Sequence, residues 1–315
     1  MAINTLTVAW FDRLKKKGVF KQGQSIVEFS PQDVLASRSA ISYFGLRHNS
    51  SSTVDAVLEE MFDGEAPRRT GSPAFYRLFG IEYYHSADLL DDRANWKRDF
   101  NLPFRLGRKF DVATNFGTAE HIFNIGNVFR SMHDVLQLNG VALHVLPAFG
   151  DIDHGFFNIH PTTYLDLAAA NDYVIEDLCY FDRWDIRDKM FVADFTREFD
   201  FDGLPIRIEH LRNRSMLQRI VTERFIENYH DPDTQRIGSQ YPGVLYDYCC
   251  VALRKTRSGR FRVPVQAYYG GGASSTKTGW RRTLARIRDR QATSQGSIAA
   301  IMACAVWRRV RHFTK

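Results

Sequence analysis

The sequence predicts an α/β protein, in which helices cover both faces of a mostly parallel sheet. The prediction rests first on residues 110–146 of the 315-residue chain. Phe110–Thr114 is an apolar run rich in β-forming residues, a polar turn over residues 115–121 follows it, and a second apolar run covers Val141–Leu146. A helical pattern fills the stretch between the turn and the second run. Strand, turn, helix and strand in this order make one βαβ unit, whose two strands are parallel.

The helix of this unit is predicted from apolar residues that recur every three or four positions. Asn139–Gly140 supplies its stop, because both residue types accept the left-handed conformation that ends many helices. The helix is therefore expected to run up to this pair. Its apolar residues are Ile122, Phe123, Ile125, Val128, Phe129, Met132, Val135, Leu136 and Leu138.

Apolar runs elsewhere predict further strands, with helical patterns between them. The expected strands are Gln24–Phe29, Ile81–Ser86, Tyr173–Phe181 and Val244–Arg254, followed by Arg260–Tyr269. The expected helices are residues 1–23 (ending near Lys15–Gly18), Val34–Phe44 with Ser30 or Asp33 as its N-cap, Val54–Phe62, Ala74–Phe79 and His160–Asn171. The last strand pair is expected to form an antiparallel edge of the sheet.

Positive charge is concentrated at the C-terminus. Residues 280–315 hold nine Lys or Arg and one acid, a sum of +8, so residues 1–279 sum to −2 in a chain of net charge +6. We predict an α/β domain over residues 1–269 with a helical insertion or cap at 203–242, a Gly/Ser linker at 270–279 and a basic amphipathic tail at 280–315. The tail is expected either to contact an anionic membrane surface or to be solvated, and the body is not expected to bind nucleic acid.

Composition indicates a globular protein of the cytoplasm, with the tail as a candidate contact to the inner face of the membrane. Apolar residues make up 44% of the chain and charged residues 25%. The longest uncharged apolar run, Ile298–Trp307, is about half the length of a spanning helix. The chain has only four cysteines and no CxxC pair, and this low count is typical of a reducing compartment.

Four segments of the sequence carry a family resemblance, namely Ile26–Asp33, His85–Asp88, Arg98–Pro103 and Phe110–Asn124. Together they resemble the class I S-adenosylmethionine-dependent methyltransferases. The closest likeness is to a bacterial branch whose turn after the fourth strand reads GGTxEHVFN, and residues 116–124 here read FGTAEHIFN. The resemblance covers roughly residues 20–200 and 244–269, and it implies a Rossmann-like sheet of seven strands with an antiparallel edge strand.

The resemblance implies S-adenosylmethionine as the cofactor and assigns it a set of binding residues. Glu28, Ser30 and Gln32 would border its methionine and ribose. Asp88 would accept hydrogen bonds from the two ribose hydroxyls, because one carboxylate can accept several donors. Its alternative role is to cap the segment that follows.

The adenine and the methionine part would be held by two further segments. Asp99 would accept a hydrogen bond from the adenine amine, with the ring of Phe100 beside it, unless this loop acid is simply solvated. Asn115, Gly117 and Thr118 would contact the methionine part, and Glu120 with His121 would lie nearest the sulfonium and the acceptor. The alternative explanation for Glu120 is structural, because an acidic residue at the start of a helix is favoured by the helix dipole alone.

The first turn departs from the family pattern. The usual E/DxGxGxG glycines let the backbone approach the ligand, whereas Phe29–Asp33 contains no glycine. A serine and glutamine turn could bind the cofactor with side chains instead. Otherwise the fold would persist without tight cofactor binding.

The candidate catalytic residues are His121, His154 and Asp153. A neighbouring carboxylate can raise the basicity of an imidazole, which titrates near neutral pH. No HxxxH or HExxH spacing occurs, so no metal is expected.

These residues predict methylation of a hydroxyl or carboxyl group on a small molecule or glycan, by direct displacement. One alternative is a non-catalytic binding or assembly protein with the same fold. A dinucleotide or nucleotide-sugar enzyme ranks last, because GxGxxG is absent after the first strand.

Overall fold

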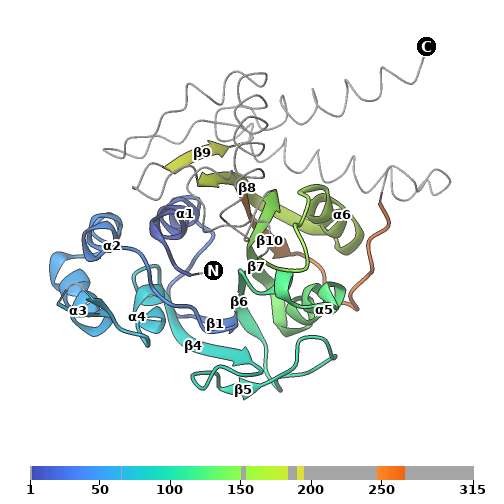
Figure 1. The fold of residues 1–315 in the computed structure, drawn as a ribbon, viewed down its shortest axis with the longest axis horizontal. Helices are drawn as coiled ribbons and strands as arrows, with labels where there is room; N and C mark the ends of the chain where they lie inside the picture. Colours follow the sequence, from blue (N-terminus) through green and yellow to red (C-terminus); the bar gives the residue numbers. More distant parts are fainter. Residues whose placement is uncertain (1, 65, 150–153, 184–189, 195–246, 267–315) are drawn as a thin grey trace, which may run out of the picture. The chain divides into compact units, whose positions relative to one another are not determined.

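A computed structural model describes residues 2–64, 66–149, 154–183, 190–194 and 247–266 (Figure 1). The chain divides into two compact units, one of residues 1–146 with 252–261 and the other of residues 147–251 with 262–315. The predicted insertion at 203–242, the linker at 270–279 and the tail at 280–315 lie outside the described residues, so the domain bounds stay a prediction.

Eight strands form one sheet in the order β5-β4-β1-β6-β7-β10-β8-β9. The pairs β1–β4, β1–β6, β4–β5 and β6–β7 are parallel, and β8–β9 is antiparallel, with β9 at the edge. The predicted fold class is therefore confirmed, with one strand more than the expected seven. The bounds are β1 Gln24–Phe29, β4 Ile81–Asp88, β5 Trp96–Lys97, β6 Phe110–Phe116, β7 Leu136–Phe149, β8 Tyr173–Arg183, β9 Met190–Asp194 and β10 Asp247–Lys255.

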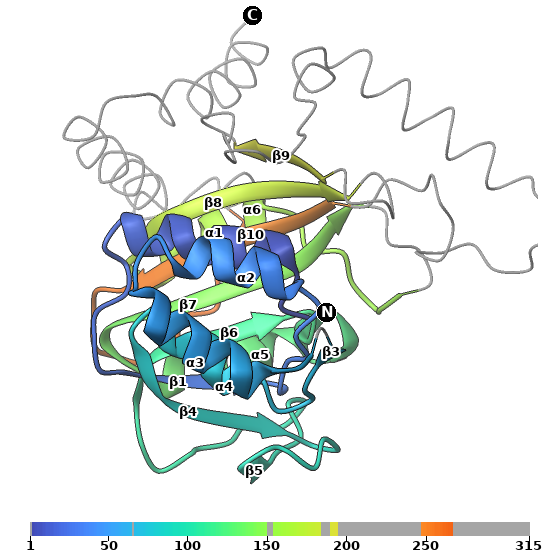
Figure 2. The same ribbon diagram turned by 90° about the vertical axis from the view of Figure 1, so that its left-hand side faces the viewer.

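Helices cover both faces of the sheet in the first unit. Helices α1 (Thr5–Lys16), α2 (Arg38–Gly45), α3 (Ser51–Met61) and α4 (Ser72–Arg77) lie on one side, and α5 (Ile125–Val135) lies on the other (Figures 1 and 2). A short pair of strands, β2 (Phe62–Asp63) and β3 (Ala66–Pro67), follows α3.

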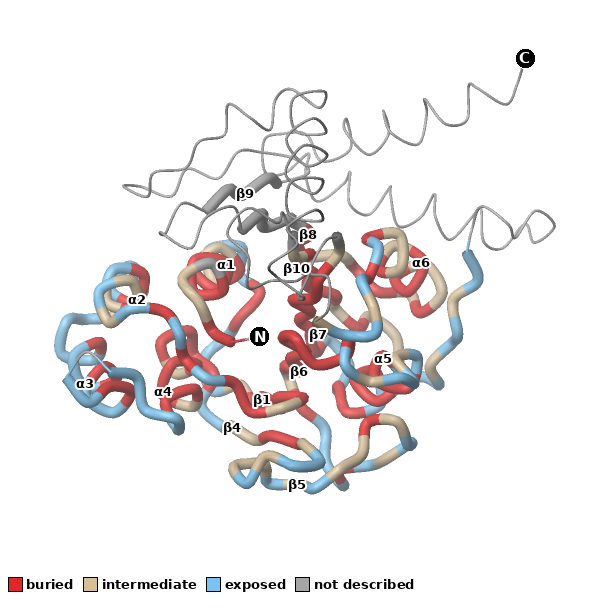
Figure 3. The backbone as a smooth tube through the Cα atoms, viewed as in Figure 1, coloured by how far each residue is buried: buried red, intermediate tan, exposed pale blue. Residues whose placement is uncertain are grey.

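The core of the first unit lies between its central strands and the two helices α1 and α4, where Figure 3 shows many buried residues. Strand β1 is buried from Ser25 to Phe29, as expected for a parallel strand covered on both faces. Phe11 of α1 packs against Phe75 of α4 and Phe116 of β6, with ring centroids 5.2 and 6.2 Å away. Aromatic burial thus fixes α1 and α4 over the sheet.

Helix α2 begins four residues later than predicted, and its cap is Ser37, which accepts a hydrogen bond from the Ala40 amide. Neither Ser30 nor Asp33 caps it. The intervening residues instead pair with the N-terminus, since Val34 forms a parallel bridge with Ile3. The early start was wrong because this pairing takes the backbone out of the helical region.

Helix α5 also ends earlier than predicted, at Val135, and β7 begins at Leu136. The Lys255 ammonium donates to the carbonyls of His133 and Leu136 and so satisfies the end of the helix. Asn139 has φ +65°, and a Cβ on Gly140 would lie 3.0 Å from three carbonyl oxygens. The Asn139–Gly140 pair therefore shapes an irregularity at the start of β7 and does not stop the helix.

The second unit contains α6 (Thr162–Asn171), β8 and β9. Pro161 precedes the first turn of α6, and Asp172, with φ +56°, ends the helix. The strand expected at Arg260–Tyr269 is absent from its described part, which ends at residue 266. There the amide and carbonyl of Arg262 bond to the side chain of Asn171, at 2.8 and 2.9 Å, so this backbone pairs with a side chain.

Candidate functional site

The predicted site residues of the first unit gather where the strand order reverses. From β1 the chain continues to β4 on one side and later returns to β6 on the other. Phe29 is in register with Ala87 of β4 and Asn115 of β6, so the three strands end side by side. In open α/β sheets the crevice outside the carboxyl ends at such a reversal binds ligands.

The glycine-free turn after β1 is built by side chains. Ser30 adopts φ +71°, a conformation that usually requires glycine, and its amide donates to the Ala87 carbonyl at 2.8 Å. Gln32 is buried, and its amide group donates to the Ser30 carbonyl at 3.0 Å. The backbone amide of Gln32 donates to Glu28 at 3.1 Å. The turn is thus closed by Glu28 and Gln32.

Glu28 is completely buried beneath this turn. Its carboxylate accepts hydrogen bonds from the hydroxyls of Tyr76 and Tyr84, the second at 2.5 Å. Burial raises its pKa to about 7, although the bonds from both tyrosines and from Gln32 act in the opposite direction. Burial and the neighbouring Glu28 also raise the tyrosine pKa values. A direct contact with the cofactor would require Glu28 to give up these partners, so its geometry suits support of the turn.

Arg93 ties the first turn to the loop after β4. Its guanidinium donates to the Pro31 carbonyl at 3.2 Å, to Asp33 at 2.7 Å and to Asp91 at 2.6 Å. The hydrogen bond from Arg93 is the main reason that the pKa of Asp91 falls to about 2. The Arg93 side chain is only 15% exposed and that of Asp91 only 18%, so their ion pair is shielded from water, whereas Asp33 is 60% exposed. Two of these bonds, to Pro31 and Asp33, hold a turn that has no glycine.

Asp88 lies at the end of β4, half-buried, beside the first turn. One carboxylate oxygen, Oδ1, accepts from the amides of Leu90 and Asp91 at 2.7 and 2.8 Å. The other oxygen, Oδ2, accepts no bond from the described residues. The capping role and an open acceptor for a ligand are therefore both present in one side chain.

The loop of Asp99 and Phe100 is fixed against α5. Asp99 accepts from the amide and the side chain of Asn101, at 2.8 and 3.1 Å. Phe100 is buried and stacks on Phe29, the last residue of β1, with centroids 5.0 Å apart. Asn127 donates to the carbonyl oxygens of this loop. Phe100 thus contributes apolar packing at the end of β1, whereas Asp99 is turned to its own loop.

The turn after β6 is locked to both neighbouring strands. Thr118 donates from its hydroxyl to the Phe29 carbonyl at 2.8 Å, and Gly117, with φ +66°, donates to Val145 at 2.9 Å. Asn115 accepts from the Ala119 amide at 3.0 Å and lies 3.3 Å from the ring nitrogen of His144. Asn115 and Thr118 are buried, so their side chains fix the backbone of this turn.

Glu120 and His121 follow in a short 3-10 turn, Ala119–His121. Glu120 is fully buried, and the His121 side chain is 43% exposed at 3.9 Å from the Glu120 carboxylate. His121 is therefore the accessible titratable group of this turn. Asp153 lies outside the described residues, and His154 belongs to the second unit, where it is half-buried.

No family model and no curated protein matches the chain. Among solved structures, it aligns with a candidate methyltransferase from Bacillus halodurans C-125 at 11% identity, over 79% of this chain and 100% of that one, with a TM-score of 0.38. It also aligns with a candidate hemolysin from Lactococcus lactis (9% identity, 89% and 97% coverage, TM-score 0.38). An O-methyltransferase of Brevibacillus brevis in complex with S-adenosyl-L-homocysteine gives 11% identity, 89% and 78% coverage, and a TM-score of 0.36. At these values the function has to be inferred from the residues of the site.

Sequence reasoning missed Arg93, Tyr76 and Tyr84. Arg93 lies in a loop that looked merely polar, and nothing in its spacing relates it to Asp33, sixty residues earlier. The two tyrosines belong to α4 and β4, where aromatic residues are ordinarily packing residues. A buried acid such as Glu28 within an apolar strand was the one available signal, since buried carboxylates need hydrogen-bond donors.

Proposed function

We propose that this protein is an S-adenosylmethionine-dependent methyltransferase, with its cofactor across the carboxyl ends of β1, β4 and β6. The observation that carries the proposal is the position of Asp88 at the reversal of the strand order. Its Oδ1 fixes the carboxylate through two backbone amides, and its Oδ2 is left to accept from a ribose hydroxyl. The residues present therefore fit a ribose-bearing cofactor.

The other residues take supporting parts in this proposal. Ser30 and Gln32 shape the wall on which the methionine part would lie, and Gly117 with Thr118 shapes the floor. Phe100 offers an apolar edge for the adenine. When bound, the cofactor would supply a methyl group on a positively charged sulfur, and the protein would chiefly align the acceptor with it.

His121 is proposed as the base that takes the acceptor's proton. It is the exposed titratable side chain of the turn after β6, and a neutral imidazole can accept a proton near neutral pH. We propose a hydroxyl or carboxyl group of a small molecule or glycan as the acceptor. A hydroxyl needs such a base, whereas an ionised carboxylate does not.

The proposal is tested by S-adenosylhomocysteine binding to Asp88→Asn and to a matched control, Asp92→Asn. The control removes an acid from the same loop, but its side chain is 74% exposed and pairs with Arg69. Loss of a charge-assisted hydrogen bond should weaken binding about tenfold or more in Asp88→Asn and leave the control unchanged. Equal affinities of wild type and Asp88→Asn would refute the ribose assignment.

The second candidate function is a non-catalytic binding protein of the same fold, and the first turn is the observation that favours it. Gln32 fills this turn with its own side chain, where a glycine would leave room. This alternative predicts no binding of S-adenosylmethionine or its demethylated product. Methyl transfer from radiolabelled cofactor to any acceptor pool would exclude it.

A further inference from the structure

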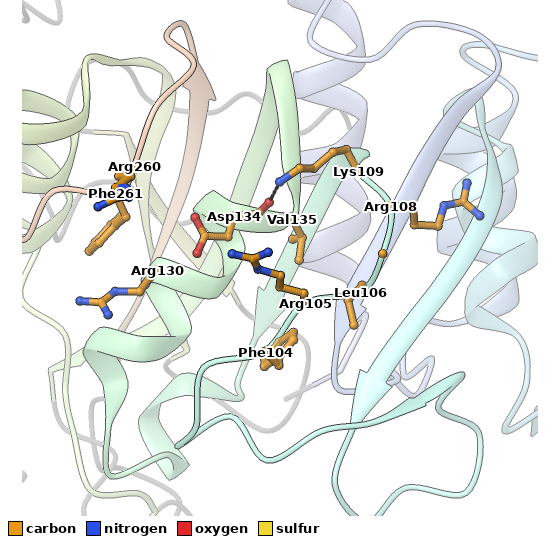
Figure 4. Close-up of a pocket in the computed structure, with 11 residues that line it drawn as sticks. Phe104, Arg105, Leu106, Arg108, Lys109, Arg130, Asp134, Val135, Arg260 and Phe261 are labelled. Atoms are coloured by element: carbon orange, nitrogen blue, oxygen red, sulfur yellow. Dashed lines mark hydrogen bonds between the residues drawn. The ribbon is translucent and has the colours of Figure 1, made fainter.

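A cavity of about 690 Å³ lies at the opposite end of β6 from the candidate cofactor site (Figure 4). Its walls come from the segment before β6, from the last turns of α5 and from the residues after β10, all in the first unit. Strand β6 has seven residues, which puts roughly 20 Å between its two ends. The cavity is therefore separate from the crevice at the carboxyl ends.

The lining is strongly cationic. Five Lys or Arg side chains and one acid, Asp134, line it. In Figure 4, Arg105 and Lys109 lie on one side of Asp134, and Arg130 and Arg260 lie on the other. The fifth cation, Arg108, contacts His85 at 3.0 Å. The net positive lining would attract an anion.

Three of the arginine side chains that line the cavity have no bonding partner in the described part of the chain. The side chains of Arg105, Arg130 and Arg260 make no hydrogen bond or ion pair among the residues that the structure describes. Each is exposed, so each guanidinium can present its planar fork to a ligand. Charges of one sign repel one another unless a counter-charge arrives, and an arginine fork matches a phosphate in a bidentate manner.

Hydrogen bonds and ring contacts hold the backbone segments that line the cavity in fixed positions. The arginines are therefore not merely neighbours on a flexible surface. His133 of α5 lies 2.9 Å from the Gly259 carbonyl, and its ring is 5.7 Å from that of Phe261. Lys255 and Lys109 bond to carbonyls at the end of α5. These contacts hold Arg260 and Phe261 against the helix that carries Arg130.

Apolar side chains complete the lining, namely Phe104, Leu106, Val135 and Phe261. An inorganic ion would leave this surface unused, whereas an aromatic or aliphatic body would cover it. The volume falls within the range of small-molecule sites, about 300–1,000 Å³. The cationic and the apolar parts of the lining together fit a ligand that carries a phosphate group on an apolar body.

We propose that this cavity is a second binding site, which takes an organic phosphate through Arg105, Arg130 and Arg260. The phosphate lies among the three guanidinium groups, and the organic body lies against Phe104 and Phe261. The site is independent of the proposed methyl transfer, and its ligand would be either a soluble phosphate ester or the headgroup of a phospholipid.

The test is calorimetric titration of the full chain with phenyl phosphate and with inorganic phosphate. Wild type should bind phenyl phosphate more tightly, with an affinity that falls as salt rises. The variant Arg105→Gln/Arg130→Gln/Arg260→Gln should bind it at least about tenfold more weakly. A matched control, Arg77→Gln, removes a cation that pairs with Glu60 at the end of α4 and should bind as wild type does. If the triple variant does not fold, Arg130→Gln alone serves, because it changes one exposed side chain of α5.

Sedimentation with vesicles of phosphatidylglycerol and phosphatidylcholine distinguishes the two sources of phosphate. Vesicle binding that wild type shows and the triple variant loses would identify a lipid headgroup. Binding of phenyl phosphate without such a difference would identify a soluble ester. Equal behaviour of wild type and the triple variant in both measurements, or no binding in either, would overturn the proposal. The Asp88→Asn variant should bind phenyl phosphate as wild type does. The phosphate-site proposal and the cofactor proposal can therefore be refuted independently of each other.

Discussion

Replacing Glu28 by glutamine should make the protein more stable at neutral pH and leave it unchanged in acid. Glu28 is completely buried, and burial raises its pKa from 4.5 to about 7. In the unfolded chain the carboxyl ionises at its ordinary pKa, whereas in the folded chain it keeps its proton until about pH 7. Stability therefore falls as pH rises from about 4.5 to about 7, because the unfolded state releases its proton first.

The magnitude follows from the pKa difference. A difference of about 2.5 between the unfolded and folded pKa corresponds to about 3 kcal/mol of unfolding free energy at neutral pH. Glutamine has the shape of the protonated acid and can accept from Tyr84 and from the Gln32 amide, but it carries no charge at any pH. Glu28→Gln should thus match wild type near pH 4 and exceed it by about 3 kcal/mol near pH 8.

Urea unfolding from pH 4 to pH 8, followed by circular dichroism, measures this difference. The control is Glu82→Gln on the neighbouring strand β4, where the side chain is exposed and bonds to Gln22. Because this variant removes no buried carboxylate, it should not show the gain of about 3 kcal/mol near pH 8 that Glu28→Gln shows. A Glu28→Gln difference that is flat with pH would show that Glu28 has the same pKa in the folded and unfolded chains, and one that turns against the variant as pH rises would show that the folded protein holds Glu28 as a stabilised anion; either result would refute the reasoning.

Three further predictions follow from the site and the sheet. Arg93→Ala should lower the unfolding free energy by about 2–3 kcal/mol and weaken S-adenosylhomocysteine binding, because it removes the guanidinium that donates to Asp91 and to the Pro31 carbonyl. His121→Ala should reduce the rate of methyl transfer to an alcohol by about a hundredfold or more, with little change in cofactor affinity, because a base acts only on the acceptor. Gly140→Ala should cost about 1–3 kcal/mol, because a Cβ there meets three carbonyl oxygens at 3.0 Å.

Each of these predictions has a matched control. Arg93→Lys keeps the charge without the planar fork and should lose most of the same stability. His133→Ala lies at the far end of α5, so it should not alter the rate as His121→Ala does. Gly126→Ala has open space around the new Cβ and lies in a helix, where alanine should add about 0.5–1 kcal/mol. Equal stabilities of the two alanine variants, a full rate in His121→Ala, or wild-type stability in Arg93→Ala would each contradict its prediction.

The sequence predicted the sheet better than the ends of its helices. Strand β1 was predicted with its observed bounds, because a parallel strand buried on both faces is a continuous apolar run. Helix α5 was predicted too long because Leu136 and Leu138 continue its apolar spacing, yet Lys255 closes the helix from far along the chain. Such distant partners leave no local pattern.

In the site, too, positions set by the strands could be predicted, whereas contacts between distant side chains could not. The carboxyl ends of β1, β4 and β6 could be placed from the sequence, and the structure puts Asp88, Asn115 and Ser30 there. The role of Arg93 could not, since it depends on side-chain contacts across loops. The net charge of −2 over residues 1–279 likewise gave no sign of the basic cavity, because a sum over a domain hides where its charges lie.

The central claim is that the crevice at the carboxyl ends of β1, β4 and β6 holds S-adenosylmethionine despite its glycine-free first turn. Calorimetric titration of the full chain with S-adenosylmethionine and with S-adenosylhomocysteine tests it most directly. We predict one site for each, with dissociation constants in the micromolar range. No binding of either compound at millimolar concentration would contradict the claim and leave the fold without this cofactor.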